Sequence, residues 1–356
     1  MNPEVPIGDH LIGSNAPPFI VAEMSANHNQ SLDRALQIVD AVAAAGAHAL
    51  KLQTYTADTM TIEAPAPEFS IEDPGSLWNG ETLHQLYDKA HTPWEWHRPI
   101  LARCRERGLI AFSTPFDASA VEFLEQLAVP CYKIASFENV DVPLIRRVAS
   151  TGKPVIISTG MASVLEIAEA VETVRAEGNH KLILLKCTSS YPSPVEDANL
   201  ETIPHMAQLF RCPVGLSDHT PGVGVAVAAV AVGATVVEKH VTLSRADGGV
   251  DAAFSLEPEE LRSLVVETGR AWRARGAVRY GPTEAELPSL QFRRSLYVVE
   301  DIREGEIITE NHIRAIRPGL GLPPKFIDDF IGKRAAREAR RGTAVKWDLL
   351  KSRGQT

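Results

Sequence analysis

Eight short runs of β-branched and other hydrophobic residues alternate with amphipathic segments from Pro18 onward, and this alternation constrains the fold more than any other feature. A strand, a helix and a further strand in succession predict parallel pairing, because a parallel neighbour needs a long crossover connection. Eight such units in roughly 260 residues predict a closed (β/α)8 TIM barrel rather than an open sheet. The predicted strands are PFIVAEMSAN, ALKLQTY, LIAFSTPF, CYKIASF, PVIISTG, KLILLKCTSSYP, CPVGLSDH and TVVEKHVTL.

The segment SLDRALQIVDAVAAAG illustrates the helical units. Leu32, Leu36 and Val39 recur at helical spacing and therefore share one face, and Gly46 ends the segment. An additional stretch from Ser76 to Ala90 is predicted as an inserted loop that carries a short helix.

The alternation stops before the end of the chain, which predicts a second domain. The stretch GPTEAELPSL is rich in Pro and Glu and has no apolar period. Beyond it lie SLYVVEDI, REGEIIT, IRAIRPGLGLPP and RRGTAVKWDLL, which are typical of a compact β-rich unit. We therefore predict a barrel over residues 1–280, a linker over 281–290 and a small C-terminal domain over 291–356.

Composition narrows the class of protein. No stretch reaches the ~20 apolar residues of a membrane helix, and the N-terminal segment lacks a signal-peptide core, so we expect a cytoplasmic protein without a membrane partner. Four widely separated cysteines are expected to be reduced thiols. The net charge of −9 argues against nucleic acid as a partner, so an anionic substrate needs locally placed cations.

Polar residues follow each predicted strand, at the end of a barrel where chemistry is located. Side chains alternate along a strand, so Lys51 with Gln53 and Glu238 with His240 each share one side, which should be the barrel mouth. The predicted ring consists of Glu23, Ser25, Asn27, Lys51, Gln53, Ser113, Thr114, Lys133, Ser136, Ser158, Thr159, Thr188, Ser189, Ser190, Ser217, His219, Glu238 and His240.

Two lysines buried among strands require negative charge nearby. A bound phosphate or carboxylate supplies that charge, and neighbouring hydroxyls can donate to its oxygens. The alternative is that Lys51 and Lys133 merely pair with Glu23 and Glu238 inside the barrel. That alternative leaves the ring of hydroxyls unexplained.

His219 and His240 end neighbouring strands, so their imidazoles can converge on one ion, with Glu23 and Asp251 nearby. Two imidazoles with open positions suit Mn2+, Co2+ or Mg2+ better than structural zinc, and we expect a catalytic ion. The alternative is a pair of hydrogen-bonded polar histidines. Asp218 faces the opposite way and is expected to be a supporting carboxylate.

The motifs AEMSANH, FSTPFD, CYKIASFE, IISTGMAS, CTSSYP, GLSDHT and VVEKHVTL resemble the sialic acid synthase family in order and spacing, and the C-terminal stretch resembles its antifreeze-like (SAF) domain. This resemblance covers nearly the whole chain. It implies a transferase that condenses phosphoenolpyruvate with an acetamido sugar and uses a divalent metal ion, with Mn2+ expected and Mg2+ or Co2+ as alternatives.

The resemblance also implies roles for individual residues. His219 and His240 would hold the ion, and Glu23 would bind water at the ion or the developing intermediate. Glu238 would face the sugar. The other implied substrate contacts are Lys51, Thr114, Lys133, Ser136, Ser158 and Ser217 for phosphoenolpyruvate, Ser189 where the family often has asparagine, and Tyr191 and Asp251 for the sugar.

The same resemblance implies that Arg317, in the IRPG stretch, reaches the acetamido group from the SAF domain of a partner subunit, in a homodimer whose SAF domain lies over the partner's barrel. TYTADTMT, SLWNGETLHQLYDKAHTPWEWH and LSRADGGVDAAFSLEP are more similar to the branch that makes pseudaminic acid than to the N-acetylneuraminate branch. The implied acceptor is 2,4-diacetamido-2,4,6-trideoxy-L-altrose. N-acetylneuraminate or legionaminate synthesis, a barrel acting on a phosphorylated aldose, and a non-catalytic carbohydrate- or ice-binding protein are the alternatives.

Overall fold

The computed structural model describes residues 3–72 and 78–350. The chain divides into two compact units, Met1–Gly276 and Ala277–Thr356, and each is described by itself.

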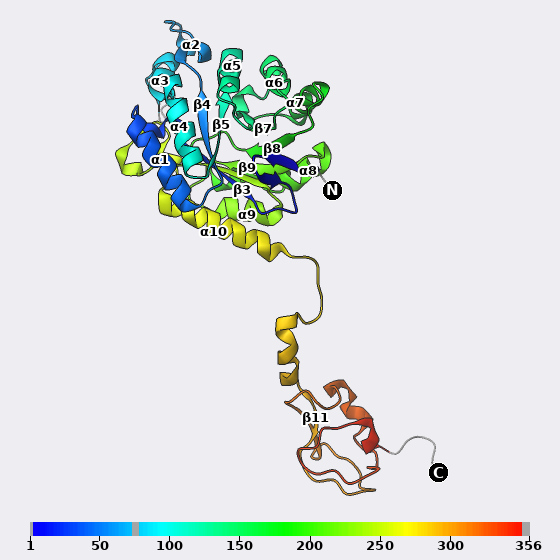
Figure 1. Ribbon diagram of the computed structural model, residues 1–356. Helices are drawn as coiled ribbons and strands as arrows, with labels where there is room; N and C mark the ends of the chain where they lie inside the picture. Colours follow the sequence, from blue (N-terminus) through cyan, green and yellow to red (C-terminus); the bar gives the residue numbers. More distant parts are fainter. Residues whose placement is uncertain (1–2, 73–77, 351–356) are drawn as a thin grey trace. The chain divides into compact units, whose positions relative to one another are not determined.

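In the described part of the first unit, eight parallel strands close into a barrel in the order β10-β3-β4-β5-β6-β7-β8-β9 (Figure 1). The predicted (β/α)8 barrel is thereby confirmed, and each predicted strand contains one barrel strand. The strands are β3 (Phe19–Glu23), β4 (Ala49–Thr54), β5 (Ile110–Pro115), β6 (Tyr132–Ile134), β7 (Val155–Ser158), β8 (Leu182–Cys187), β9 (Val214–Asp218) and β10 (Val236–His240).

Helices surround the barrel and start and stop at the residues that cap them. Ser31 caps α1 by accepting the N–H of Arg34, and Gly46 ends it at φ 85°, a backbone angle that suits glycine. The outer helices are α1 (Leu32–Ala45), α4 (Trp94–Glu106), α5 (Ala118–Gln126), α6 (Val142–Ala149), α7 (Val164–Ala176), α8 (Thr202–Phe210), α9 (Gly224–Val232) and α10 (Pro258–Arg275).

The apolar core has two layers in this unit. The larger one packs the outward faces of the strands against the helices. The smaller one fills the barrel interior with residues such as Phe19, Phe112 and Ile156. The apolar layer occupies the barrel interior near the starts of the strands. The polar side chains at the strand ends therefore lie at the opposite end of the barrel, where active sites of such barrels are found.

A short hairpin that the sequence did not reveal packs on this interior layer. It consists of β1 (Val5–Ile7) paired antiparallel with β2 (His10–Ile12). Val5, Ile7 and Ile12 are buried in the same cluster as Phe19. The hairpin thus covers the apolar end of the barrel.

An insertion follows β4 and contains α2 (Ala57–Met60), the 3-10 turn η2 (Pro67–Phe69) and α3 (Leu83–Ala90). The expected short helix is present as α3, and Thr82 caps it with a capping box. Ser76, where the predicted insertion began, lies outside the described residues.

The second unit is small and mostly irregular. β11 (Ser295–Val298) pairs antiparallel with β12 (Ile313–Ile316), and the turns η8 (Pro324–Asp329) and η9 (Trp347–Leu349) complete it. Leu296, Ile308 and Phe330 belong to its own core. The stretch predicted as a linker, 281–290, overlaps the 3-10 helix η7 (Glu284–Phe292), which begins after Thr283 and has no buried residue.

Among the described residues, no helix combines the length and the apolar character needed to cross a membrane.

Candidate active site

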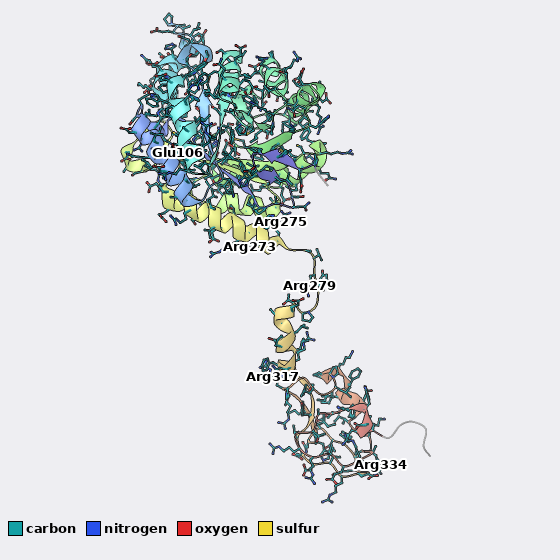
Figure 2. All side chains as sticks on the ribbon, viewed as in Figure 1. Glu106, Arg273, Arg275, Arg279, Arg317 and Arg334 are labelled. Carbon is teal, nitrogen blue, oxygen red and sulfur yellow. The ribbon has the colours of Figure 1, made fainter. Side chains whose placement is uncertain are left out.

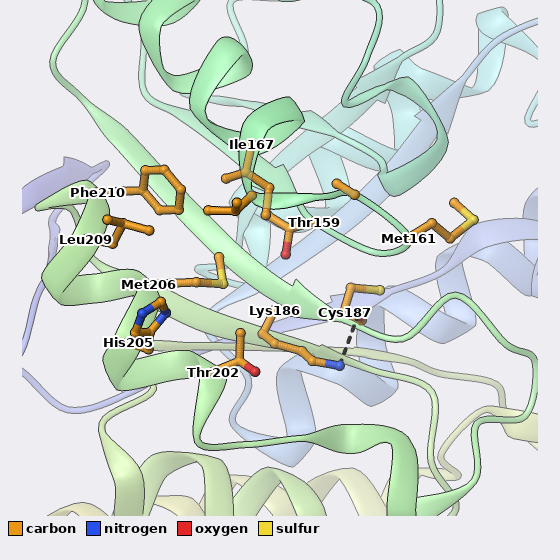
Figure 3. A pocket seen from close by; sticks show the side chains of 12 residues that line it. Thr159, Met161, Ile167, Lys186, Cys187, Thr202, His205, Met206, Leu209 and Phe210 are labelled. Atoms are coloured by element: carbon orange, nitrogen blue, oxygen red, sulfur yellow. Dashed lines mark hydrogen bonds between the residues drawn. The ribbon is translucent and has the colours of Figure 1, made fainter.

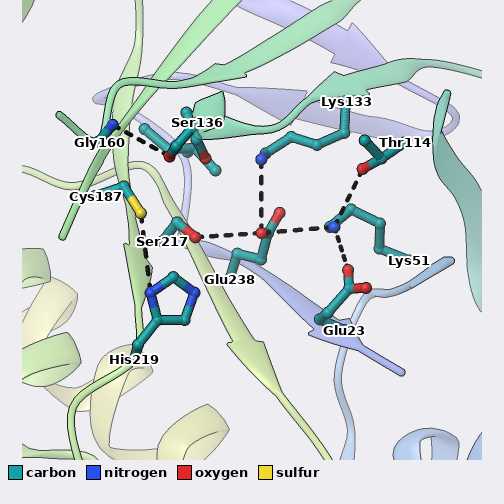
Figure 4. A network of polar contacts seen from close by, with 12 residues as sticks. Glu23, Lys51, Thr114, Lys133, Ser136, Gly160, Cys187, Ser217, His219 and Glu238 are labelled. Atoms are coloured by element: carbon teal, nitrogen blue, oxygen red, sulfur yellow. Dashed lines mark hydrogen bonds and ion pairs between the residues drawn. The ribbon is translucent and has the colours of Figure 1, made fainter. Parts of the chain in front are cut away.

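Two lysines and two carboxylates from four barrel strands meet inside the barrel near the strand ends. Lys51 forms an ion pair with Glu23, and its Nζ lies 3.7 Å from Glu238 Oε1. Lys133 Nζ lies 3.7 Å from the same oxygen. Figure 4 shows both ammonium groups directed at the Glu238 carboxylate. All four side chains are at most 5% exposed, so the charges interact in a medium that water hardly screens.

The two carboxylates in this cluster differ in acidity. Burial raises the pKa of Glu23 to about 7, and the Glu238 charge adds to the rise although Lys51 opposes it. At Glu238 burial also favours the neutral acid, but Lys133 and Lys51 together hold the pKa below its usual value. Near neutral pH Glu238 is therefore a carboxylate, whereas Glu23 can hold or release a proton.

Hydroxyl groups surround the cluster. Lys51 Nζ donates to Thr114 Oγ1 at 3.3 Å, and Ser217 Oγ donates to Glu238 Oε1 at 3.2 Å. Ser136 Oγ accepts the N–H of Gly160 at 3.1 Å. Ser158 Oγ is buried without a hydrogen-bond partner in the described structure. A buried hydroxyl rarely lacks a partner, so this atom indicates the place of a bound group.

Gly160 makes room for two serines at the end of β7. A Cβ at this position would lie 2.1 Å from Ser189 Oγ and 2.8 Å from Ser136 Oγ. Since real Cβ atoms do not approach so closely, a larger residue would displace both hydroxyls. The glycine thus lets Ser136 and Ser189 approach one point from different strands.

His219 and His240 follow β9 and β10, and their ring centroids are 5.3 Å apart. His219 Nδ1 lies 2.9 Å from the carbonyl oxygen of Thr188. A carbonyl can only accept, so Nδ1 carries a proton, and in the neutral ring Nε2 keeps its lone pair. His240 Nδ1 is buried, has no hydrogen-bond partner within the described part of the chain and lies 3.8 Å from Asp251 Oδ2.

The two imidazole rings, each with a ring nitrogen that can offer a lone pair, are suited to bind one metal ion together. A backbone carbonyl that fixes the tautomer of a histidine is a common arrangement behind a metal-binding ring. Within the described residues, no group of three or more His, Cys, Asp or Glu side chains is arranged to hold an ion. An ion at this place would therefore complete its coordination with water or substrate.

A cavity of about 460 Å³ lies at this end of the barrel. Tyr191 and Asp251, both expected to face the sugar, line it together with Ser189 and His240. Asp251 lies in the loop after β10, and its carboxylate accepts a hydrogen bond from the Ser25 hydroxyl. The volume is of the size that holds a small ligand.

Glu138 also lines the cavity, and the sequence analysis did not select it. It ends the 3-10 turn η3 (Ser136–Glu138) after β6. Burial raises the pKa of Glu138 to about 7, and its Oε2 has no hydrogen-bond partner among the described residues. The signal in the sequence is that Glu138 directly follows the predicted strand CYKIASF.

Asp218 has the supporting place expected for it. Its Oδ2 lies 3.0 Å from Lys239 Nζ, and its Oδ1 accepts the N–H of Thr220 at 2.9 Å. Both side chains of the pair are fully buried, so the charges balance each other away from the cluster around Glu238.

Arg317 belongs to the second unit, where it follows β12 and is exposed (Figure 2). The described barrel brings together the lysines, carboxylates and histidines predicted for the site. Thr159 and Thr188 of the predicted ring do not join them, because Thr159 lines an outer cavity and the Thr188 hydroxyl accepts a hydrogen bond from Lys186 there.

A second cavity, of about 380 Å³, lies outside the barrel against α7 and α8 (Figure 3). Lys186 and His205 are among its lining residues. Lys186 Nζ donates to the carbonyl oxygens of Cys187 and Asp197, both at 3.2 Å, and to Thr188 Oγ1 at 2.7 Å. This ammonium group is saturated by the protein itself, so the outer cavity offers no free cation.

The fold and the site together define a (β/α)8-barrel enzyme whose mouth combines two buried lysines, two carboxylates and two histidines. The chain belongs to the NeuB family, whose model matches residues 38–280, and a SAF domain model matches residues 293–351. The resemblance predicted from the motifs is confirmed by these matches.

Individual relatives are similar over most of the chain. The pseudaminic acid synthase of Campylobacter jejuni is 42% identical over 328 residues, covering 92% of this chain and 95% of that one. The pseudaminic acid synthase of Helicobacter pylori is 42% identical over 334 residues, covering 93% and 97%. The crystal structure of an N-acetylneuraminic acid synthetase from Leptospira borgpetersenii, in complex with citrate, has a TM-score of 0.73 at 33% identity and covers 82% of this chain and 97% of that chain.

Proposed function

We propose that the chain condenses phosphoenolpyruvate with 2,4-diacetamido-2,4,6-trideoxy-L-altrose to give pseudaminic acid and phosphate. The observation that carries the proposal is the buried cluster in which Lys51 and Lys133 share one Glu238 oxygen. Ser158 Oγ, at the end of β7, is also buried and has no hydrogen-bond partner among the described residues. Two ammonium groups and a hydroxyl ring form a site for a small, highly charged anion. The acceptor is supported by the 42% identity to two pseudaminic acid synthases.

Phosphoenolpyruvate fits the cluster because it carries both a phosphate and a carboxylate. Lys51 and Lys133 supply charge, and the hydroxyls of Thr114, Ser136 and Ser217 can donate to its oxygens. Ser158 and Ser189 complete the contacts. Within the cluster, Glu23 and Glu238 attract the two lysines. A bound anion would take over part of that attraction, so these ion pairs do not prevent the lysines from binding phosphoenolpyruvate.

His219 and His240 would hold the divalent ion, for which we propose Mn2+. Bound there, the ion would act as a Lewis acid on the aldehyde oxygen of the acceptor. The hydrogen bond from His219 to Thr188 orients one imidazole. Tyr191 and Asp251 would bind the sugar beside it.

The chain's own residues would then direct bond making. C3 of phosphoenolpyruvate forms a bond to C1 of the sugar as the C1=O and C2=C3 π bonds break, and the aldehyde oxygen takes up a proton. Water adds to the electrophilic C2 and loses its protons, and the C2–O bond to phosphate breaks, which leaves a ketone at C2 and releases phosphate. Lys51 and Lys133 stabilise the phosphate charge throughout, which requires no covalent nucleophile. Glu23 is placed to exchange the proton of the added water, because its pKa of about 7 makes both of its states accessible. Glu238 would orient the acceptor.

We further propose a homodimer in which Arg317 of the SAF domain reaches the acetamido group over the barrel of the partner. A guanidinium group can donate two hydrogen bonds to such a ligand. We place the enzyme in the cytoplasm, and this is supported by four buried cysteines that are free thiols.

The proposal is tested by phosphate release from phosphoenolpyruvate with Mn2+ and a panel of acceptors, with the products identified by mass spectrometry. We expect the altrose derivative to be used best. Faster use of N-acetylmannosamine or of another diacetamido sugar would assign the chain to N-acetylneuraminate or legionaminate synthesis instead. Preference for a phosphorylated aldose, or no release with any acceptor, would contradict the proposed reaction.

A further inference from the structure

The cavity at the barrel mouth has walls of different chemical character. One wall comes from the barrel and its loops and carries most of the polar groups, beside apolar residues such as Phe116 and Phe137. Its residues include Ser25, Gln53, Ser189, Tyr191, His240 and Asp251. The insertion after β4 supplies another wall, which is mostly apolar. Its residues are Met60, Ile71, Trp78, Leu83, Leu86 and Tyr87.

The apolar wall is held in place by contacts within the insertion and to the barrel. His84 Nε2 lies 3.0 Å from Asp58 Oδ1 and so joins α3 to α2. Trp78 Nε1 donates to the carbonyl oxygen of Val250 at 3.2 Å. The rings of Tyr87 and Tyr55 are 5.8 Å apart, and Leu86 is buried. The wall is therefore a packed surface rather than a loose loop.

The polar wall determines which end of the acceptor sugar lies against the apolar wall. The aldehyde must react beside His240 and the lysine cluster, so C1 of the sugar lies against the barrel. The carbons remote from C1 then extend toward α2 and α3. The described lining residues of the insertion offer them methyl and methylene groups from Met60, Leu83 and Leu86. The polar atoms among these lining side chains are the Tyr87 hydroxyl and the Trp78 N–H, which donates to Val250.

We infer that α2 and α3 form the specificity element for the acceptor: Met60, Leu83 and Leu86 receive the C6 methyl group of a 6-deoxy acetamido sugar and disfavour a hydroxymethyl group there. The inference deepens the proposed function and rests on it. A methyl group gains from burial against apolar atoms, whereas a hydroxyl in the same place loses its water without gaining a partner. An apolar pocket of this kind discriminates by roughly 10–100-fold.

The test uses the full chain with phosphoenolpyruvate and Mn2+ and compares two acceptors that differ at C6 alone: 2,4-diacetamido-2,4,6-trideoxy-L-altrose and its 6-hydroxy counterpart. The wild type should prefer the 6-deoxy sugar by about 10–100-fold in kcat/KM. Met60→Gln and Leu83→Asn place an amide of similar size in the wall and should each lower this preference about fivefold or more. The KM for phosphoenolpyruvate should stay unchanged.

Ile62→Asn is the matched control, because Ile62 lies between α2 and η2, is 60% exposed and is not among the residues that line the cavity. It should keep the wild-type preference. Met60 and Leu83 are only half-buried, so both variants should fold, and Leu83→Ala provides a second variant if Leu83→Asn does not.

The outcomes separate the two proposals. If the wild type uses neither altrose derivative, the proposed function fails. If it uses the 6-deoxy sugar but Met60→Gln and the Leu83 variants leave the preference unchanged, or if the wild type uses both sugars equally, the apolar wall does not select the acceptor and only this inference is overturned.

Discussion

Lys133 Nζ lies 3.7 Å from Glu238 Oε1, in a part of the barrel where both side chains are at most 5% exposed. Lys51 approaches the same oxygen at the same distance. One carboxylate oxygen therefore attracts two ammonium groups, and Lys51 Nζ also donates to the Thr114 hydroxyl. Structural ion pairing and anion binding, which the sequence presented as alternatives, are compatible at this site.

Replacement of either lysine tests the anion site. Lys51→Met or Lys133→Met should raise the KM for phosphoenolpyruvate much more than that for the sugar, by roughly 10-fold or more, because the lost charge faces phosphate or carboxylate. Steady-state kinetics with each substrate varied in turn measures this. Lys186→Met is the control, since Lys186 lines the outer cavity beside α7 and α8. Unchanged phosphoenolpyruvate parameters in both site variants would leave these lysines with a purely structural role.

The histidine pair predicts dependence on a divalent ion. His219→Ala or His240→Ala should keep the fold and lower kcat by at least ~100-fold, and chelation by EDTA should reproduce the loss. Readdition of Mn2+ should restore the wild type but neither variant. His205→Ala, outside the barrel, should behave as wild type. Full activity of enzyme shown to be free of metal would exclude a catalytic ion.

Much of the site could be predicted because, in a barrel of parallel strands, the residues at the strand ends lie together at one end of the barrel. Each strand ends where its hydrophobic run becomes polar, and alternation along β10 places Glu238 and His240 on the same side. The structure confirms that Glu238 is directed into the barrel and that His240 lines the cavity above it.

What the sequence did not reveal depends on turns and long-range packing. Glu138 lies beyond the end of β6, in a 3-10 turn whose direction alternation does not determine. The strands of the N-terminal hairpin have three residues each, which is too short for a recognisable period. Met60 and Leu83 reach the cavity through an insertion whose path over the barrel depends on tertiary contacts such as that of Trp78 with the Val250 carbonyl oxygen.

The environment of His48 leads us to predict that the folded protein loses stability in acid. Its Nδ1 accepts the N–H of Ile20 at 2.9 Å, so protonation of this nitrogen would break the bond. Burial lowers the pKa of His48 to about 4, and the neighbouring His10 adds to the effect. Between pH 6.5 and 4 the unfolded chain therefore binds more protons than the folded chain, and the free energy of unfolding falls as the pH is lowered.

The expected contribution of His48 is about 2 kcal/mol at pH 4, after allowance for its partial exposure. His48→Asn keeps an acceptor for Ile20 but cannot be protonated. Urea unfolding at several pH values should show a shallower decline for this variant between pH 6.5 and 4. Equal slopes for variant and wild type would show that His48 titrates normally in the folded chain.

Glu138 predicts a pH dependence of acceptor binding. As a carboxylate in the cavity, it can accept a hydrogen bond from an acetamido N–H. Because the pKa of Glu138 is raised to about 7 by burial, the KM for the acceptor should fall as the pH rises through 7. Glu138→Gln should remove that dependence and raise the KM for the sugar about 10-fold at pH 8. The reason is that a hydrogen bond to an ionised carboxylate is stronger than one to a neutral amide oxygen. An unchanged pH profile in the variant would exclude contact between Glu138 and the acceptor.

Arg317 predicts that activity depends on the second unit of the chain. It is exposed and follows β12 in a stretch rich in Pro and Gly, so its guanidinium group is available to a ligand. Arg317→Ala should raise the KM for the sugar or lower kcat by roughly 10–100-fold, in line with the loss of two charge-assisted hydrogen bonds. Arg314→Ala, at an exposed position on β12, is the matched control and should leave the kinetics unchanged.

Subunit exchange tests whether this arginine acts in a partner's site. In a homodimer with shared sites, an Arg317→Ala chain keeps an intact barrel and a Lys51→Met chain keeps an intact Arg317. Mixing the two impaired chains should raise activity above that of either chain alone, because one site of each heterodimer then contains both residues. Mass spectrometry of the intact dimer verifies the exchange. Exchange without recovery would rule out sharing between subunits, and normal sugar kinetics in Arg317→Ala alone would remove this arginine from the site.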